Sequence, residues 1–148
     1  MNEIEETAMR LRVVFRKLSR KVDTLNEADA PTRSEHVVLA WLDENGLMTP
    51  SALAVAQKVR PQTMGQTLDA LDRRRWIKRA PHPEDRRQIL ISLSPAGQKA
   101  LAKGRALRQA WLVGELKKAT GSDRKTLREA LGILERFFPD EPKAPSKS

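Results

Sequence analysis

The sequence of 148 residues contains no cysteine and no tyrosine, and only three phenylalanines. Without thiols the chain cannot form disulfides, use a thiolate nucleophile, hold an iron–sulfur cluster or build the usual zinc sites. No stretch approaches the roughly 20 apolar residues that cross a bilayer, and the acidic start of the chain does not resemble a signal peptide. These absences predict a soluble, intracellular protein.

The residue patterns that support catalysis are missing as well. The chain has no glycine-rich phosphate loop, no histidine paired with a carboxylate at a recognisable spacing, and no carboxylate cluster in an apolar setting. His36 and His82 have no third ligand near them that would complete a metal site. We therefore expect no enzyme, no cofactor and no metal.

Positive charge is in surplus. Lysine and arginine number 28 against 19 acidic residues, which gives a net charge of +9. Such a surplus in a small protein favours a polyanionic partner, either nucleic acid or an acidic membrane surface. Residues 73–87 alone hold seven basic and two acidic side chains. The partner should therefore contact this segment.

The two ends of the chain predict helices with apolar stripes. From Ile4 to Leu25 the apolar residues recur at alternating spacings of four and three, which predicts a long helix ended by Pro31. A helix of about 25 residues is ~37 Å long, more than one small core covers. Its stripe packs either on its own chain or, as we favour, partly on a second subunit. A similar stripe runs from Leu127 to Phe138, in a helix opened by Ser122-Asp123.

Capping signals divide the middle of the chain into short helices. Thr32 and Glu35 have the spacing of a capping box. Thr49-Pro50 and Arg60-Pro61 each place proline in a first helical turn, and Ser94-Pro95 does the same for a long helix that Thr120-Gly121 ends. These signals predict helices from about 33 to 43, from 50 to 58, from 61 to 74 and from 95 onward.

A β-hairpin is predicted between the last two of these helices. Alternating apolar residues favour a strand over 88–93, paired with a strand over 76–80. The connecting tip, residues 81–87, contains two prolines and is basic. The predicted fold class is therefore mainly α with a small β-hairpin wing, in which a helix-turn-helix is followed by the wing.

The second helix of this motif has two contrasting faces. Met64, Leu68 and Leu71 share one face, and Gln62 and Gln66 lie on the other. In a helix-turn-helix the second helix enters the major groove, where glutamine can read adenine and arginine can read guanine. A polar face opposite an apolar one indicates solvation and nothing more by itself. The basic hairpin beside it is what favours DNA.

Six segments carry motifs that occur together: Leu53-Ala54, Val59-Arg60-Pro61-Gln62-Thr63, Leu68-Asp69-Ala70-Leu71, Ile77-Lys78-Arg79, His82-Pro83-Glu84-Asp85-Arg86-Arg87 and Leu93-Ser94-Pro95-Ala96-Gly97. Together they resemble the MarR family of bacterial multiple-antibiotic-resistance-type regulators. The resemblance covers residues 32–98 in motif and the whole chain in helix order. Its most specific part is the wing Pro-x-Asp-Arg-Arg, followed by an alternating strand and Leu-Ser-x-x-Gly.

The resemblance implies a homodimer with a winged helix-turn-helix that binds palindromic operator DNA, as a repressor in the cytoplasm, associated with the nucleoid. Residues 1–30 and 94–138 would form the dimerisation region, residues 31–93 the DNA-binding domain, and residues 139–148 a disordered tail. Two alternatives stay open: a winged-helix module that docks other proteins, and a nucleic-acid-binding protein without ligand response. RNA is disfavoured because few aromatics are available for stacking.

The implied site residues fall into three groups. The DNA contacts are Arg60, Gln62, Thr63, Gln66, Thr67, Arg73, Arg74, Asp85, Arg86 and Arg87. The dimerisation residues are Leu11, Phe15, Leu18, Leu127, Leu131, Leu134 and Phe138. The candidates for binding a small aromatic or anionic effector are Arg16, His36, Trp41 and Trp111. The alternatives are that the tryptophans fill the core, that His36 belongs to a capping turn, that Asp85 only bonds its own backbone, and that Arg87 is a solvated charge.

This chain departs from the family pattern at three positions. Arg75 stands where the family commonly has glycine in a left-handed conformation, so either Arg75 is strained, at a cost of about 1 kcal/mol, or the helix ends differently. Arg60 cannot accept a backbone donor at the start of its helix, which suggests a phosphate contact instead of a cap. His82 replaces a commonly acidic wing residue.

Overall fold

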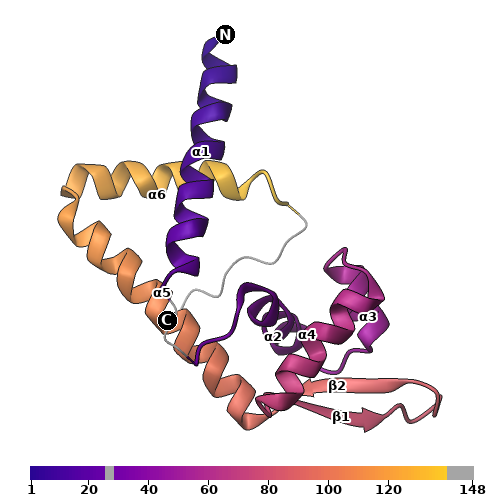
Figure 1. Cartoon of the computed structure of the whole chain (residues 1–148). Coiled ribbons are helices and arrows are strands. Elements are labelled where there is room, and N and C mark those ends of the chain that lie inside the picture. Colours follow the sequence, from indigo (N-terminus) through magenta and orange to yellow (C-terminus); the bar gives the residue numbers. More distant parts are fainter. Residues whose placement is uncertain (26–28, 140–148) are drawn as a thin grey trace. The chain divides into compact units, whose positions relative to one another are not determined.

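A computed structural model describes residues 1–25 and 29–139, which form six helices and one hairpin (Figure 1). The chain divides into two compact units, residues 1–108 and 109–148. The predicted fold class is confirmed. In chain order the elements are α1 (Glu3–Asp23), α2 (Arg33–Asn45), α3 (Pro50–Ala56), α4 (Pro61–Arg73), β1 (Ile77–Pro81), β2 (Ile89–Leu93), α5 (Pro95–Lys118) and α6 (Gly121–Glu135).

The middle helices begin where the capping signals predicted. The hydroxyl oxygen of Thr32 accepts the Glu35 N–H at 3.2 Å, and the Glu35 carboxylate accepts the Thr32 N–H at 3.3 Å. Thr49 caps α3 by accepting the Ala52 N–H at 3.1 Å. Because each cap satisfies donors that a helix start leaves free, these residues fix the boundaries of α2 and α3.

The first helix ends earlier than predicted. α1 stops at Asp23, and its cap Thr24 donates its backbone N–H to the carbonyls of Lys21 and Val22. The Thr24 hydroxyl donates to the Lys21 carbonyl as well, at 2.6 Å. This tight final turn closes the helix well before Pro31, and it leaves Leu25 outside the helical stripe.

The last helix is also shifted. α6 begins at Gly121 and not at Ser122-Asp123, because Thr120 accepts the Asp123 N–H at 3.0 Å and the Asp123 carboxylate accepts the Thr120 N–H at 3.3 Å. The helix ends at Glu135, so Phe138 lies beyond it. Of the predicted disordered tail, residues 140–148 lie outside the described residues.

The two strands are antiparallel, and each differs from its predicted range by a residue. Ile77 lies opposite Leu93, and Pro81 lies opposite Ile89. The connection between α2 and α3 adds a bridge on the outer edge of β2, where Met48 and Ile91 exchange backbone hydrogen bonds of 3.1 and 2.8 Å. In the part of the chain that the structure describes, the outer edge of β1 pairs with no other strand.

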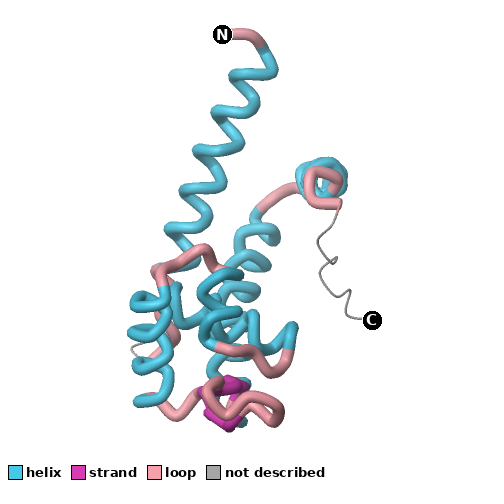
Figure 2. Tube along the Cα trace, turned by 90° about the vertical axis from the view of Figure 1, so that its right-hand side faces the viewer, coloured by secondary structure: helices cyan, strands magenta, loops and turns pink. Residues whose placement is uncertain are grey.

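The core lies where α2, α3 and α4 meet the base of the hairpin and the first half of α5 (Figure 2). α4 contributes Met64, Leu68 and Leu71, each at most 1% exposed, as its apolar face predicted. Ile91 is fully buried, whereas Ile89 is 41% exposed because the hairpin extends beyond the core. The alternation predicted for this strand therefore buries only its base.

Candidate nucleic-acid interface

The polar face of α4 points away from the core. Gln62, Thr63 and Gln66 are exposed, on the side opposite the buried Met64 and Leu68. The amide side chains are thus available to a partner. If α4 entered a groove of duplex DNA, these polar side chains would face the base edges and the rigid helix would support them.

Thr67 has a different environment. Its side chain is half-buried, and its hydroxyl donates to the carbonyl of Thr63 one turn earlier, at 3.2 Å. This local bond holds the Thr67 oxygen along the helix axis. Thr67 is therefore less available for base contacts than the residues of the exposed face.

Two arginines flank the polar face. Arg60 is the N-cap of α4 and makes no side-chain capping bond, as its chemistry predicted. Arg73 occupies the last turn of α4 and is exposed. Both residues lie at the ends of the polar face of α4, where phosphate contacts would position a helix in a groove.

The wing tip presents an exposed arginine. The Arg87 side chain is 92% exposed, and its Nε lies 3.3 Å from Oδ1 of Asp85. The same Asp85 oxygen accepts the backbone N–H of Arg87 at 3.0 Å. Asp85 therefore both closes the turn and orients the guanidinium, so the two interpretations of this residue hold together. Arg86 is exposed beside them.

His82 organises the tip, which the sequence did not indicate. Its Nδ1 accepts the backbone N–H groups of Glu84 at 3.1 Å and of Asp85 at 3.2 Å. Its own backbone N–H donates to the Gln88 carbonyl at 3.1 Å. In this arrangement Nδ1 carries no proton, and the imidazole shapes the turn that presents Arg87.

Arg79 connects the wing to α4. Its Nε lies 2.6 Å from Oδ2 of Asp72, and its Nη2 lies 3.6 Å from Oδ1 of Asp69. The pairing fixes the orientation of β1 relative to α4 and neutralises two carboxylates close to the basic surface. Sequence reasoning missed Arg79, although the Asp69-x-x-Asp72 spacing on one helix face was visible.

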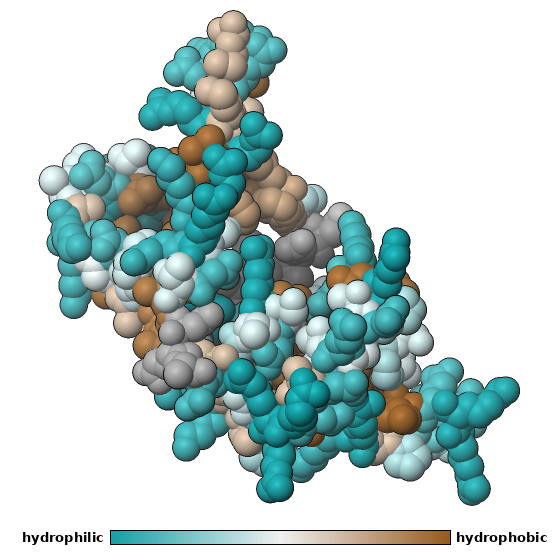
Figure 3. All heavy atoms as spheres, viewed as in Figure 1, coloured by the Kyte–Doolittle hydropathy of each residue, from teal (hydrophilic) through white to brown (hydrophobic). Residues whose placement is uncertain are grey.

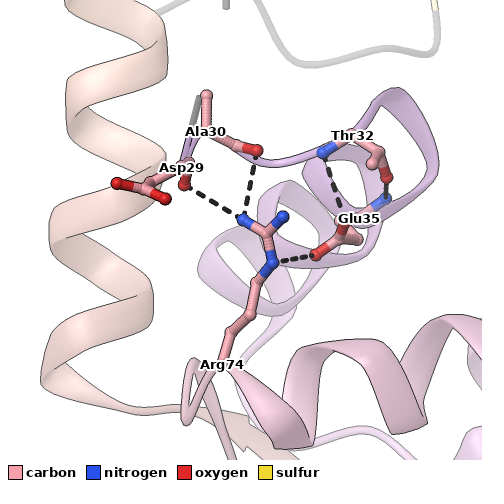
Figure 4. Close-up of polar contacts among 5 residues, drawn as sticks. All are labelled: Asp29, Ala30, Thr32, Glu35 and Arg74. Carbon is pink, nitrogen blue, oxygen red and sulfur yellow. Dashed lines mark hydrogen bonds and ion pairs between the residues drawn. The ribbon is translucent and has the colours of Figure 1, made fainter. Parts of the chain in front are cut away.

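Arg74 was grouped with the DNA contacts, but the structure engages it within the chain (Figure 4). Its Nη1 donates to the carbonyls of Asp29 at 3.0 Å and Ala30 at 3.2 Å, and its Nε lies 3.4 Å from a carboxylate oxygen of Glu35. The guanidinium also lies 4.5 Å from the ring centroid of Trp76. Because these contacts engage Nη1 and Nε within the chain, we leave Arg74 out of the interface.

Arg75, in the turn after α4, adopts the left-handed conformation in which the family commonly has glycine. Its φ is 59°, so the residue is left-handed without being glycine. The Ser94 hydroxyl donates to the Arg75 carbonyl at 2.6 Å and accepts the Gly97 N–H at 3.0 Å, while the Ser94 N–H donates to the Trp76 carbonyl at 3.0 Å. The Leu-Ser-x-x-Gly motif therefore clamps the turn that joins α4 to the wing.

The proposed dimerisation residues lie on α1 and α6, except Phe138, which follows α6. Neither α1 nor α6 has a buried side chain. Leu11, Phe15, Leu18, Leu127, Leu131 and Phe138 are exposed, Phe15 by 67%, and Leu134 is half-buried. Figure 3 shows apolar side chains along α1 and hydrophilic ones around the end of the hairpin.

The effector candidates are divided between the two units. Arg16 is exposed on α1, Trp41 packs against the core, and Trp111 lies in the second unit. His36 is half-buried, and Nη1 of Arg108 lies 3.1 and 2.8 Å from its two ring nitrogens. Burial, together with the charges of Arg108 and Arg105, lowers the pKa of His36 to about 4. His36 is therefore neutral near pH 7.

A cavity of about 280 Å³ lies elsewhere in the first unit, and none of these four candidates lines it. Its walls are residues 29–31, Trp76 and one face of α5 that includes Lys99 and Lys103. Residues 1–25 and 29–139 contain no group of acidic or histidine side chains that could hold a metal ion. No helix in these ranges is long and apolar enough to span a membrane.

The sequence model of the MarR family matches residues 31–88, the segment that contains the helix-turn-helix and the wing. An HTH-type transcriptional regulator of Mycobacterium bovis is 33% identical over 132 residues, which cover 89% of this chain and 92% of the relative. The multiple antibiotic resistance protein MarR of Salmonella typhimurium is 30% identical over 89 residues, 58% of this chain and 62% of the relative.

Solved structures agree. A Pseudomonas aeruginosa protein described as a transcriptional regulator superposes with a TM-score of 0.83 at 31% identity, covering 95% of this chain and 99% of that one. A mutant MarR of E. coli shares the fold, with a TM-score of 0.75 at 24% identity, over 86% of this chain and 94% of that one. The exposed polar face of α4 and the basic wing are consistent with these relatives. The chain belongs to the MarR family of HTH-type transcriptional regulators, which act by binding DNA and not as enzymes.

Proposed function

We propose that this regulator is a homodimeric repressor that binds a palindromic operator. The observation that carries the proposal is the pairing of two surfaces in the first unit. The exposed Gln62 and Gln66 lie on a helix whose other face is buried, and Arg79 ties that helix to the hairpin that presents Arg87. Gln66 would read a base edge in the major groove, and Arg87 would enter the adjacent minor groove.

Dimerisation is supported by the apolar side chains of α1 and α6. A monomer would expose Phe15, Leu131 and Phe138 to water together with their neighbours on these helices. Exposed apolar surface of this kind marks interaction sites. In this proposal residues 1–30 and 94–138 supply the subunit contact, and residues 31–93 bind DNA.

Binding to an operator of known sequence tests the proposal. Genomic fragments retained by the purified protein would supply the operator, and fluorescence anisotropy would compare the full palindrome with one isolated half-site. We expect half-sites about one helical turn, ~34 Å, apart, since this spacing suits a dimer. The affinity should fall steeply with salt because phosphate contacts release counterions.

Three results would contradict the proposal. They are equal affinity for one half-site and for the palindrome, a monomer by light scattering at micromolar concentration, and stable binding that does not depend on salt. A pull-down that retains a protein and no DNA fragments would favour the alternative of a protein-docking module.

We further propose that a small aromatic or anionic effector releases the regulator from DNA. The support is the cavity in the first unit, which has mostly apolar walls with two lysines and one aspartate. Adding candidate compounds to the protein–operator complex and measuring anisotropy tests release. A compound that binds the protein without lowering its operator affinity is not an effector.

A further inference from the structure

His82 holds the tip of the wing through one ring nitrogen. Its Nδ1 has a single lone pair and accepts two backbone N–H groups, that of Glu84 at 3.1 Å and that of Asp85 at 3.2 Å. The His82 N–H donates to the Gln88 carbonyl at 3.1 Å, and the Gln88 N–H donates to the Asp85 carbonyl at 3.0 Å. The conformation of this turn therefore depends on a Nδ1 that carries no proton.

The hydrogen bonds of the turn continue to the arginine at the tip. Oδ1 of Asp85 accepts the backbone N–H of Arg87 at 3.0 Å and lies 3.3 Å from Nε of the same residue. The Arg87 side chain is 92% exposed, so its direction depends mainly on this carboxylate. The backbone of Asp85 is in turn held by Nδ1 of His82. His82 thus acts on Arg87 through one intermediate residue.

We propose that His82 is a positioning residue for Arg87, and that protonation of its imidazole releases the tip, so that mild acid weakens operator binding. The inference rests on the contact of Arg87 with the minor groove that is proposed above, and it adds a residue and a pH dependence to that contact. Histidine is the side chain that ordinarily gains a proton between about pH 8 and pH 5. In a neutral imidazole whose Nδ1 accepts, Nε2 already carries the proton, so a second proton binds at Nδ1.

Protonation reverses the role of Nδ1 from acceptor to donor. The new N–H points at the backbone N–H groups of Glu84 and Asp85, so two hydrogen bonds become two repulsions between donors. Both backbone groups then turn to water, and the Asp85 carboxylate moves with its backbone. The Arg87 guanidinium is no longer held in one direction. An arginine that is not held in advance loses more conformational entropy when it enters the groove, which lowers the affinity for DNA.

The sign of the expected effect separates this mechanism from simple charge attraction. The tip lies at the end of the hairpin farthest from α5, and Arg79 on β1 pairs with Asp72 of α4 (Figure 1). A proton added to His82 raises the positive charge beside the phosphates, which by itself strengthens DNA binding. A weakening on acidification therefore indicates that the turn opens. The charged side chains of the tip itself are Glu84, Asp85, Arg86 and Arg87, two of each sign.

The first measurement uses the full chain without DNA. Nitrogen NMR of the His82 ring identifies which nitrogen carries the proton, and the amide signals of Glu84 and Asp85 are followed between about pH 8 and pH 5.5, where histidine ordinarily titrates. We expect an unprotonated Nδ1 at the upper end, and amide signals that shift as the ring gains its proton. The matched variant is His82→Asn, whose Oδ1 accepts from nearly the position of Nδ1 and does not titrate. Its amide signals should stay nearly constant.

The second measurement is operator binding by anisotropy over the same pH range. The affinity of the parent should fall at least about fivefold toward acid pH, as expected when one groove contact is lost. His82→Leu, which fills the space without an acceptor, should bind weakly throughout. The asparagine variant should bind more tightly than the leucine variant and show little pH dependence, and the fall should disappear in Arg87→Ala. His36, with a pKa of about 4, stays neutral in this range and is common to every variant.

The proposal is overturned if Nδ1 already carries the proton at the upper end of the range, or if the amide signals do not follow the ring. It is also overturned if acid strengthens operator binding, if the asparagine variant has the same pH dependence as the parent, or if Arg87→Ala keeps the full fall. Because the NMR measurement needs no DNA, a chain that binds no operator would refute the proposed function while the role of His82 in the turn is still decided by the NMR result.

Discussion

A Cβ at Gly97 would overlap the backbone carbonyl oxygen of Trp76, so the first turn of α5 lies directly against the peptide that joins α4 to the hairpin. The same carbonyl accepts the Ser94 N–H at 3.0 Å. This contact has no flexible side chain that could give way. The spacing between α5 and the turn is therefore set by backbone on both sides.

Replacing Gly97 by alanine should destabilise the protein by about 1–3 kcal/mol, because backbone must shift to make room for one methyl group. The matched control is Gly104→Ala on the same helix, where a Cβ meets open space. That change should be neutral or stabilising by up to about 1 kcal/mol, since alanine is the better helix former. Urea unfolding of both variants gives the comparison, and equal midpoints would contradict the packing described here.

Replacing Arg75 by glycine should stabilise the protein by about 1 kcal/mol, because glycine adopts the φ of 59° without the steric cost that a side chain incurs. Arg75→Ala is the control, since it removes the same charge and keeps the strain. Thermal unfolding should therefore rank the glycine variant above the alanine variant. The reverse order would show that the left-handed conformation is not strained here.

Replacing Gln66 by alanine should change the base preference at one operator position by about 1–3 kcal/mol, because a side chain that reads a base edge is lost. Arg73→Ala should instead weaken binding to all sequences about equally and lower the salt slope by about 1, as expected of a phosphate contact. Binding to a library of operator variants checks both changes. If the Gln66 variant kept the same base preference, α4 would not be the helix that reads the bases.

Replacing Arg79 by alanine should weaken operator binding more than the loss of one charge explains. The change frees the wing and leaves the carboxylates of Asp69 and Asp72 without their cationic partner beside the DNA. Adding Asp72→Ala to the same chain should restore part of the affinity, because it removes one of the two repelling charges. Anisotropy on the operator compares the single and double variants, and a double variant no better than the single one would refute this role.

Acid should destabilise the first unit through His36. Its pKa in the folded protein is about 4, below the 6.5 of the unfolded chain, so between these values the unfolded state binds more protons. The contribution of His36 to stability is thus complete above pH 6.5 and is lost as the pH falls toward 4. Urea midpoints measured across this range should fall less steeply in His36→Gln than in the parent. Identical slopes would contradict the shifted pKa.

Local chemistry made much of this fold predictable. Thr32, Thr49 and Pro61 act within one helical turn, so the boundaries they set could be read from neighbouring residues. The apolar face of α4 was equally predictable, because the apolar side chains of Met64 and Leu68 recur at helical spacing. Arg75 could be identified as an anomaly, although only its φ decided between strain and a different helix end.

Long side chains with distant partners were not predictable in the same way. Arg74 follows the exposed Arg73 in sequence, and nothing local distinguishes them; its partners Asp29 and Ala30 lie more than 40 residues away. The sequence showed only that His82 replaces a commonly acidic wing residue, whereas in the structure its Nδ1 accepts two backbone N–H groups of the tip. The ends of α1 and α6 were missed because the apolar spacing continues past the last hydrogen-bonded turn.

The outer edge of β1, which pairs with no other strand among residues 1–25 and 29–139, affects how copies of this regulator behave when they are crowded together. Open strand edges invite pairing with another chain, but charged residues and proline discourage it. Lys78 supplies an exposed charge on β1, and Pro81 at its end has no N–H to donate. The hairpins of two neighbouring copies should therefore resist pairing into one continuous sheet, which keeps each wing separate even at high protein concentration.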